Sequence, residues 1–218
     1  MSISKQDITA VILAGGRGRR LSGQDKGLIK LNNKPMIEHI LDRLKPQTES
    51  IIINANRNQK EYSLYGFPVI SDELSEFQGP LSGFVSAMRF LQTSEQTRTP
   101  LTTQTSHILT LACDAPLLPK DYVARMVSAN TTADGIVVAH DGTQLQMIHA
   151  LIPIALLKSL DSYLEEGQRK VENWYKEYPL ILADFSDNPV AFRNINTEEE
   201  RQKAEKTHFL NKKVQDTL

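Results

Sequence analysis

Apolar residues in this chain alternate between short β-branched runs and longer stretches with helical spacing. Residues 8–14, I-T-A-V-I-L-A, form an apolar run that ends at two glycines, which is typical of a parallel strand buried on both faces. Residues 35–44 instead place apolar side chains three and four positions apart, and Pro35 suits a first helical position. The first run predicts a central parallel strand, and the second predicts a helix that follows it.

The same alternation continues along the chain. The expected strands are 50–53, 67–71, 107–112, 135–139 and 190–195, and the expected helices are 80–91, 119–127, 153–166 and 168–178. Residues 93–106 are threonine-rich and aperiodic, which predicts a polar surface loop. Asn196 and the acids after it predict the start of a last helix. Beyond that helix we expect a frayed tail over about 208–218.

This order of elements predicts an α/β fold of Rossmann-like, three-layer αβα type, with a mostly parallel sheet covered on both faces. A length of 218 residues suits a single domain over 1–218. In such a sheet, ligand sites lie outside the carboxyl ends of the strands. Several expected strands end there in glycines or polar residues, which makes those loops the candidate site.

The composition of the chain limits the classes of partner that the protein can be expected to bind. The 25 Lys and Arg nearly balance the 26 Asp and Glu, so the basic excess of a nucleic-acid binder is missing. Cys113 is the single cysteine and cannot form an internal disulfide, and the first residues lack the apolar core of a secretory signal. No apolar run approaches the roughly 20 residues of a membrane-spanning helix. We therefore expect a soluble, cytoplasmic protein that binds anions through a local site, with no nucleic-acid or membrane partner.

The segment from Leu13 to Lys30, L-A-G-G-R-G-R-R-L-S-G-Q-D-K-G-L-I-K, carries the strongest signal. A strand that opens into glycines lets the backbone approach a ligand, and its free N–H groups can bind an anion. Arg17, Arg19, Arg20 and Lys26 add cations. No Gly-Lys-Ser/Thr closes a P-loop, and the third glycine of a dinucleotide fingerprint is missing. The segment predicts a phosphate site of neither type; the alternative is a glycine turn beside solvated arginines.

Six short motifs occur in one order: L-A-G-G, D-K-G-L, I-N-A-N-R-N, S-D-E, G-P-L-S-G and C-D-A-P. With them the chain resembles the molybdenum cofactor guanylyltransferases, which have the nucleotide-diphospho-sugar transferase fold, from about Thr9 to Glu200. The resemblance implies transfer of GMP from GTP to molybdenum-molybdopterin, with Mg²⁺ as cofactor and pyrophosphate as the second product. We expect a monomer with transient contacts to proteins of cofactor biosynthesis or molybdoenzyme maturation.

The resemblance also implies a set of GTP-binding positions: Leu13, Ala14, Gly15, Gly16, Lys26, Asn54, Asp72 and Asp114. Within this set, the loop that begins at Leu13 matches the one that contacts guanine, Lys26 matches the lysine on the triphosphate, and Asp114 matches the magnesium ligand. Asn54 and Asp72 match nucleotide-contacting positions, although both residue types also commonly cap turns. For Asp114, the alternative to a magnesium ligand is a residue that only caps the following helix.

This reaction needs no nucleophilic side chain. The acceptor is a phosphate monoester whose second pKa of about 6 leaves it largely dianionic at pH 7. Magnesium on Asp114, together with the catalytic cations Lys26 and Arg20, can neutralise the triphosphate and stabilise the leaving pyrophosphate. The five histidines show no metal-ligand spacing. Cys113 is interpreted as a packed thiol.

The chain matches the family's motifs less completely in the segments expected near the molybdopterin acceptor. Gln146-Met147 stand where the family often has His-Pro, which leaves the neighbouring pterin contacts open. Arg169 or Lys170 could meet the acceptor phosphate, and residues 194–196 resemble another acceptor-side segment. Two other functions remain as alternatives. The first is a sibling enzyme that uses CTP or one that acts on a sugar phosphate. In the resembling CTP enzymes the first loop usually reads L-A-A-G rather than L-A-G-G, and the sugar-phosphate enzymes usually have a longer chain and a longer glycine-rich signature. The second is a catalytically silent nucleotide-binding module.

Overall fold

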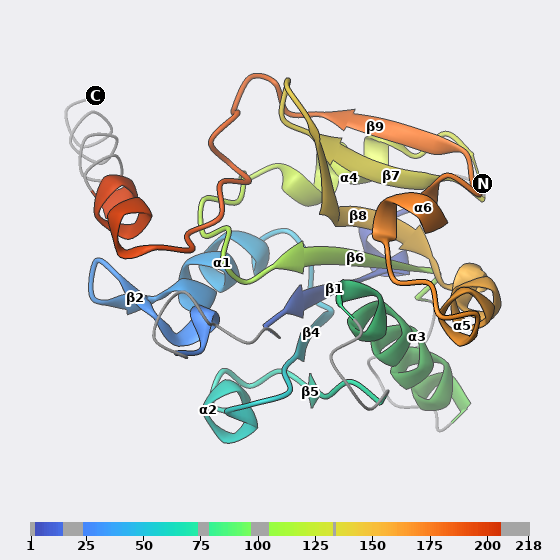
Figure 1. Ribbon diagram of the computed structural model, residues 1–218, viewed down its shortest axis with the longest axis horizontal. Coiled ribbons are helices and arrows are strands. Elements are labelled where there is room, and N and C mark those ends of the chain that lie inside the picture. The colour runs from blue at the N-terminus through green and yellow to red at the C-terminus, as the bar shows by residue number, and fades with distance from the viewer. Residues whose placement is uncertain (1–2, 15–23, 74–78, 97–104, 133, 206–218) are drawn as a thin grey trace.

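A seven-stranded sheet forms the middle layer of the computed structural model, with helices on both faces (Figure 1). The structure describes residues 3–14, 24–73, 79–96, 105–132 and 134–205. The sheet has the order β5-β4-β1-β6-β8-β7-β9. Its strands are β1 (Ile8–Leu13), β4 (Ile51–Asn54), β5 (Val69–Ile70), β6 (His107–Ala112), β7 (Ile136–His140), β8 (Leu145–Pro153) and β9 (Leu180–Asp184).

Two apolar layers hold the helices against this sheet. One layer contains α1 (Met36–Leu44), α4 (Tyr122–Ala129) and Tyr62 of α2 (Gln59–Ser63); the other contains α3 (Pro80–Gln96), α5 (Leu157–Glu165) and α6 (Val171–Tyr175). β1 contributes side chains to both apolar layers, because Ile8, Ala10 and Ile12 face the first layer and Val11 faces the second. Burial on both faces explains why its sequence is almost continuously apolar.

The remaining elements are short. They are the 3₁₀ helices η1 (Lys5–Asp7), η2 (Lys26–Leu28) and η3 (Ile154–Leu156), and a hairpin of β2 (Lys30–Leu31) and β3 (Lys34–Pro35). Residues 198–205 are helical, which confirms the expected last helix. No helix in the described ranges is long and apolar enough to cross a membrane.

The expectation of a mostly parallel sheet is confirmed. β1 lies between β4 and β6 and is parallel to both, and β5 extends the parallel set at the edge. β8 runs antiparallel to β6 and β7, and β9 is parallel to β7. β1 is therefore an interior strand with parallel neighbours on both sides, as its apolar run predicts.

The prediction of a strand at 190–195 is wrong. These residues form turns and irregular backbone in the structure. Ala191, Phe192 and Ile195 are nevertheless buried, with Phe192 packed against the rings of Tyr122 and Phe185. Their apolar side chains pack this irregular segment against the core instead of pairing in a sheet.

Other boundaries also differ from the sequence prediction. The expected loop at 93–106 is wrong at its start, because α3 continues to Gln96, while 97–104 lies outside the described residues. Pro35 is the N-cap of α1 rather than its first residue. Pro153 ends β8 instead of beginning a helix. α2 and β9 were not predicted, and the tail expected at 208–218 lies outside the described residues.

A histidine lies at the centre of the aromatic cluster between β8 and α4. His149 is 2% exposed, and its ring contacts Tyr122 at 6.0 Å and Phe192 at 4.8 Å between centroids. Neither ring nitrogen has a hydrogen-bond partner. Burial lowers the pKa of His149 to about 3, so the folded protein keeps this ring neutral.

His149→Phe should make unfolding less sensitive to acid. Between pH 6.5 and 3 the unfolded chain binds a proton at position 149 that the native state excludes, so stability falls with falling pH. The wild type should lose about 2 kcal/mol more than the variant between pH 6.5 and 5, because one pKa unit corresponds to about 1.4 kcal/mol. Urea unfolding of both proteins at the two pH values measures this difference. Equal losses would show that His149 titrates normally in the fold.

Candidate functional site

Three parallel strands end at the same level of the sheet. Leu13 at the end of β1 lies opposite Asn54 of β4 on one side and Ala112 of β6 on the other. The Ala14 amide continues this ladder by donating to the Asn54 carbonyl at 2.8 Å, and the Cys113 amide donates to the Leu13 carbonyl at 3.1 Å. The loops that follow these strands therefore leave from one edge. Figure 1 shows β1 and β6 pointing to that edge side by side.

Of the residues expected in the first loop, the structure places Leu13 and Ala14 at this edge. Gly15, Gly16 and Arg20 lie outside the described residues, so their expected roles remain predictions.

Lys26 and Asp114 meet as an ion pair across this edge. The Lys26 ammonium lies 2.8 Å from Asp114 Oδ2, and it also donates a hydrogen bond to Asn196 Oδ1. The Asp114 side chain is 11% exposed and that of Lys26 is 27% exposed, so the pair is only partly screened by water. Two residues far from Lys26 in the chain, Asp114 and Asn196, thus meet at its ammonium.

Two backbone features fix Asn196 beside this pair. The Ile195 amide donates to the Asp114 carbonyl at 2.9 Å, which ties the segment to the end of β6. Glu200 Oε2 accepts from the Asn196 and Thr197 amides at 2.7 and 3.0 Å, and Thr197 Oγ1 accepts from the Glu200 amide at 3.2 Å. This is a capping box at the start of the last helix. The family resemblance implies an acceptor-side position for Asn196, and the T-x-x-E pattern that follows it was the available sequence signal for its fixed position.

Asp72 organises the neighbouring loops. Its carboxylate accepts hydrogen bonds from Asn54 Nδ2 at 3.1 Å, from Asn56 Nδ2 at 2.8 Å and from Ser82 Oγ at 2.8 Å. Asn54 and Ser82 are both buried. The structure therefore brings Asn54 and Asp72 together as predicted, with Asp72 joining the ends of β4 and β5 to the first turn of α3.

Gly83 lets α3 approach the end of β1. A Cβ atom at this position would lie 2.7 Å from Asn54 Oδ1 and 2.8 Å from Leu13 Cδ2, closer than van der Waals contact allows. The close packing at this position therefore explains why the last residue of the G-P-L-S-G motif is a glycine. It allows α3 to pack against two residues expected to contact the nucleotide.

The residues considered for the acceptor side, Arg169, Lys170 and Gln146, lie apart from the Lys26–Asp114 ion pair in their contacts. The Arg169 guanidinium donates to the carbonyls of Leu164 and Gln168, at 2.7 and 2.6 Å, at the end of α5. Lys170 is exposed. Gln146 Nε2 donates to Asp141 Oδ2 at 2.7 Å. None of these contacts involves Lys26 or Asp114, so the structure does not join these residues to the ion pair.

Cys113 is a buried free thiol, in keeping with the interpretation of a packed side chain. Burial raises the pKa of this thiol well above its usual value, which disfavours the thiolate that a nucleophile needs. Within the described ranges, no cluster of three or more His, Cys, Asp or Glu side chains could hold a metal ion. A metal at this edge would rely on fewer protein ligands.

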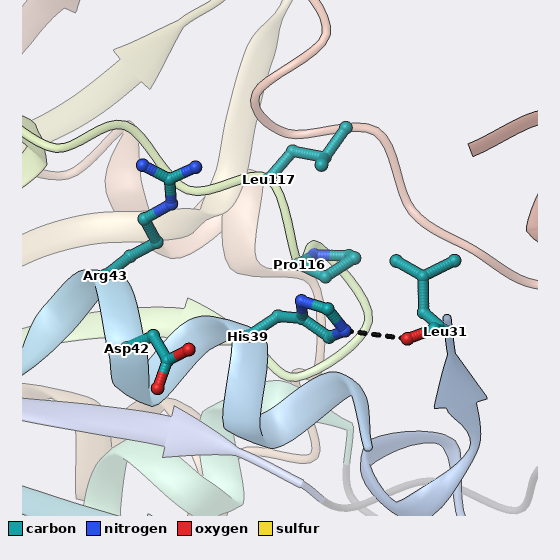
Figure 2. Close-up of a pocket in the computed structure, with 6 residues that line it drawn as sticks. All are labelled: Leu31, His39, Asp42, Arg43, Pro116 and Leu117. Atoms are coloured by element: carbon teal, nitrogen blue, oxygen red, sulfur yellow. Dashed lines mark hydrogen bonds between the residues drawn. The ribbon is translucent and has the colours of Figure 1, made fainter. Parts of the chain in front are cut away.

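A separate pocket of about 240 Å³ lies between α1, the end of β2 and the segment that contains Pro116 and Leu117 (Figure 2). Its lining residues are Leu31, His39, Asp42, Arg43, Pro116 and Leu117. The His39 ring forms a hydrogen bond through Nε2 with the Leu31 carbonyl at 2.9 Å, which joins α1 to the β2 end of the hairpin. Neither Lys26 nor Asp114 lines this pocket, so it is distinct from the ion-paired edge.

Gly83→Ala should destabilise the protein although alanine is favoured over glycine in helices by about 1 kcal/mol. The overlap with Asn54 and Leu13 should outweigh that gain and leave a net loss of about 1–3 kcal/mol in the free energy of unfolding. Urea unfolding measures it. Gln92→Ala, at an exposed position of the same helix, is the control and should change stability by less than about 0.5 kcal/mol. A Gly83→Ala protein as stable as the wild type would contradict the close packing.

Comparison with known proteins gives concordant results. Residues 10–180 match the model of the MobA-like NTP transferase domain. The chain is 46% identical over 196 residues to a protein of Shewanella loihica named molybdenum cofactor guanylyltransferase, covering 89% of this chain and 94% of that protein. A protein of the same name from Shewanella piezotolerans is also 46% identical over 196 residues, covering 89% and 90%.

Solved structures show the same fold at low identity. Molybdopterin-guanine dinucleotide biosynthesis protein A from Archaeoglobus fulgidus superposes with a TM-score of 0.70 at 17% identity, over 91% of this chain and 97% of that one. A nucleotidyl transferase from Methanothermobacter thermautotroptrophicus gives 0.70 at 18% identity, over 94% and 98%. From the matched domain and the identity to its curated relatives, we conclude that the chain belongs to the MobA-like NTP transferase family.

Proposed function

We propose that this protein transfers the GMP moiety of GTP to the phosphate of molybdenum-molybdopterin, giving the molybdopterin guanine dinucleotide and pyrophosphate. The observation that carries this proposal is the convergence of Lys26, Asp114 and Asn196 at the carboxyl edge of the sheet. Family membership and the name shared by the curated relatives support the choice of reaction.

GTP would lie across the ends of β1 and β4. Leu13, Ala14 and the following Gly15 and Gly16 would offer backbone groups to the guanine edge, while Asn54, held by Asp72, would contact the base or ribose. The Asp72 carboxylate already accepts three hydrogen bonds, so its contribution to the nucleotide site would be to hold Asn54 in place.

Asp114 and Asn196 fit a magnesium ion. Both present oxygen atoms, which Mg²⁺ prefers, and both already converge on a positive charge, the Lys26 ammonium. Two protein ligands are sufficient in principle, because Mg²⁺ commonly keeps several waters and binds substrate phosphates. When bound, Mg²⁺ would neutralise charge on the triphosphate. This assignment adds Asn196 to the single ligand, Asp114, that the sequence suggests.

The reaction is a displacement at the α-phosphorus of GTP. An acceptor phosphate oxygen forms the new P–O bond while the bond to the β-phosphate oxygen breaks, and pyrophosphate leaves with that electron pair. The acceptor is already anionic near pH 7, so it needs no strong base. Lys26 and Arg20 would hold the triphosphate and counter the charge that grows on pyrophosphate. The chain's own contribution is then orientation and electrostatic stabilisation.

A nucleotide screen tests this function. The purified protein should release pyrophosphate from GTP when Mg²⁺ and molybdopterin carrying molybdenum are both present, and it should use CTP and ATP much less. Faster release from CTP would favour a cytidylyl enzyme. Binding of GTP without any release of pyrophosphate would favour a silent nucleotide-binding module, and either result would contradict the proposal.

Lys26→Met and Asp114→Asn should each lower kcat by on the order of a hundredfold, because each removes a charge at the reacting phosphates. Asp114→Asn should also raise the Mg²⁺ concentration needed for half-maximal rate. Lys34→Met is the matched control, since the Lys34 ammonium pairs with Asp42 and not with Asp114. Steady-state rates at saturating GTP measure these effects. A Lys26 variant with wild-type kcat would remove the proposed role of that residue.

A further inference from the structure

A buried carboxylate directly precedes Lys26. Asp25 is 7% exposed, and it caps η2 by accepting a hydrogen bond at Oδ1 from the Gly27 amide at 3.3 Å. Its carbonyl accepts from the Leu28 amide at 3.1 Å. A buried carboxylate is stable only when donors satisfy its oxygens. Whatever satisfies Asp25 therefore also fixes the backbone from which the Lys26 side chain extends.

Two donors come from the segment around α2. The Tyr62 hydroxyl donates to Asp25 Oδ1 at 2.5 Å, and Asn58 Nδ2 donates to Asp25 Oδ2 at 3.1 Å. Tyr62 is completely buried. Burial is the main cause that raises the pKa of its hydroxyl, and the neighbouring Asp25 raises it further, so the hydroxyl remains a donor.

Tyr62 also packs against the residue on the other side of Lys26. A Cβ atom at Gly27 would collide with the Tyr62 hydroxyl and would lie 3.3 Å from two carbons of its ring. Tyr62 thus contacts both neighbours of Lys26, one through a hydrogen bond and one through close packing. The glycine of the D-K-G-L motif is explained by the room that this ring requires.

We propose that Tyr62 is a positioning residue for nucleotidyl transfer, which clamps Asp25 and Gly27 and so aims the Lys26 ammonium at Asp114. The inference rests on the proposed role of Lys26. Without the hydroxyl, Asp25 loses one of its donors and η2 gains freedom, so the ammonium is held less well against the triphosphate. Leu13 and Asn54 lie outside this clamp and continue to bind the nucleotide. The loss should therefore appear in turnover more than in GTP binding.

Tyr62→Phe tests the clamp, because it removes one hydroxyl and keeps the ring. We expect kcat to fall on the order of tenfold while KM for GTP changes less than about twofold. Tyr122→Phe is the matched control: Tyr122 is equally buried, and its hydroxyl donates one hydrogen bond to the Thr110 carbonyl at 3.2 Å. That control should leave kcat within about twofold of the wild type. Equal falls in kcat for both variants would overturn the proposal.

A double-mutant cycle separates positioning from a general loss of stability. In a Lys26→Met background, Tyr62→Phe should cause no further fall in kcat, because the residue it positions is gone. The same fold-change with and without Lys26 would overturn the proposal. If Lys26→Met itself keeps full activity, the proposed role of Lys26 fails and the clamp fails with it. A loss for Lys26→Met with none for Tyr62→Phe refutes the clamp alone.

Asn58→Gly gives a second, independent perturbation of Asp25. Asn58 has a φ of 51°, a left-handed conformation that glycine adopts without strain, so the change removes the amide donor and spares the backbone. We expect a smaller fall in kcat than for Tyr62→Phe, again absent in the Lys26→Met background. If Tyr62→Phe does not fold, this cycle decides the question, and an unchanged kcat for Asn58→Gly would then count against the clamp.

Discussion

Parallel pairing of β1 with β4 on one side and β6 on the other places three strand ends at a single edge of the sheet. Alternate residues of β1 pack into two different apolar layers, so the register of β1, and with it the position of this edge, is tied to the hydrophobic core. A slip of one residue would turn every side chain of a strand to the opposite face. The loops beyond Leu13, Asn54 and Ala112 therefore face one another for reasons unrelated to any ligand. The site uses a geometry that the core already requires.

Three carboxylates near this edge are satisfied in different ways, and the difference suggests different tasks. Asp25 and Asp72 accept hydrogen bonds from neutral donors and join loops to the framework. Asp114 instead pairs with the ammonium of Lys26. Neutral donors fixed within the fold make a permanent anchor, whereas a mobile ammonium can exchange places with another cation or move to a phosphate. On this reasoning Asp25 and Asp72 shape the site, and Asp114 takes part in its chemistry.

Sequence patterns predicted the parts of the fold whose environment is uniform. β6 was predicted with its observed bounds because all of its residues lie inside the sheet, and α1 was predicted because one face of it is apolar. α2 was missed because it has only five residues, of which Tyr62 alone is buried. β9 was missed because Leu180 and Leu182 are exposed at the edge of the sheet. Residues 190–195 were predicted as a strand because an irregular segment with buried side chains can have the same apolar run.

In the candidate site, too, some residues could be predicted from the sequence and others could not. Asn54, Asp72 and Asp114 were singled out by the family resemblance, and the structure places them where strands of one sheet end, while their contacts with the nucleotide stay predictions. The side chain of Asn196 could not be placed, because its approach to Lys26 depends on a backbone contact between Ile195 and Asp114 that no local pattern encodes. The part played by Tyr62 depends likewise on the path of the chain between β4 and β5. Contacts set by topology can be inferred from sequence, whereas those set by a particular loop path need the structure.

We infer that this chain transfers a guanylyl group by direct displacement, using orientation and charge rather than a nucleophile of its own. The measurement that tests it most directly is the configuration at phosphorus after transfer from one diastereomer of GTP with sulfur on the α-phosphate. We expect the thioguanylyl group to appear on the molybdopterin phosphate with inverted configuration, as one displacement requires. Retained configuration would show two displacements through a covalent intermediate on a side chain, and failure to transfer the group from a diastereomer that binds and from GTP itself would contradict the proposed activity altogether.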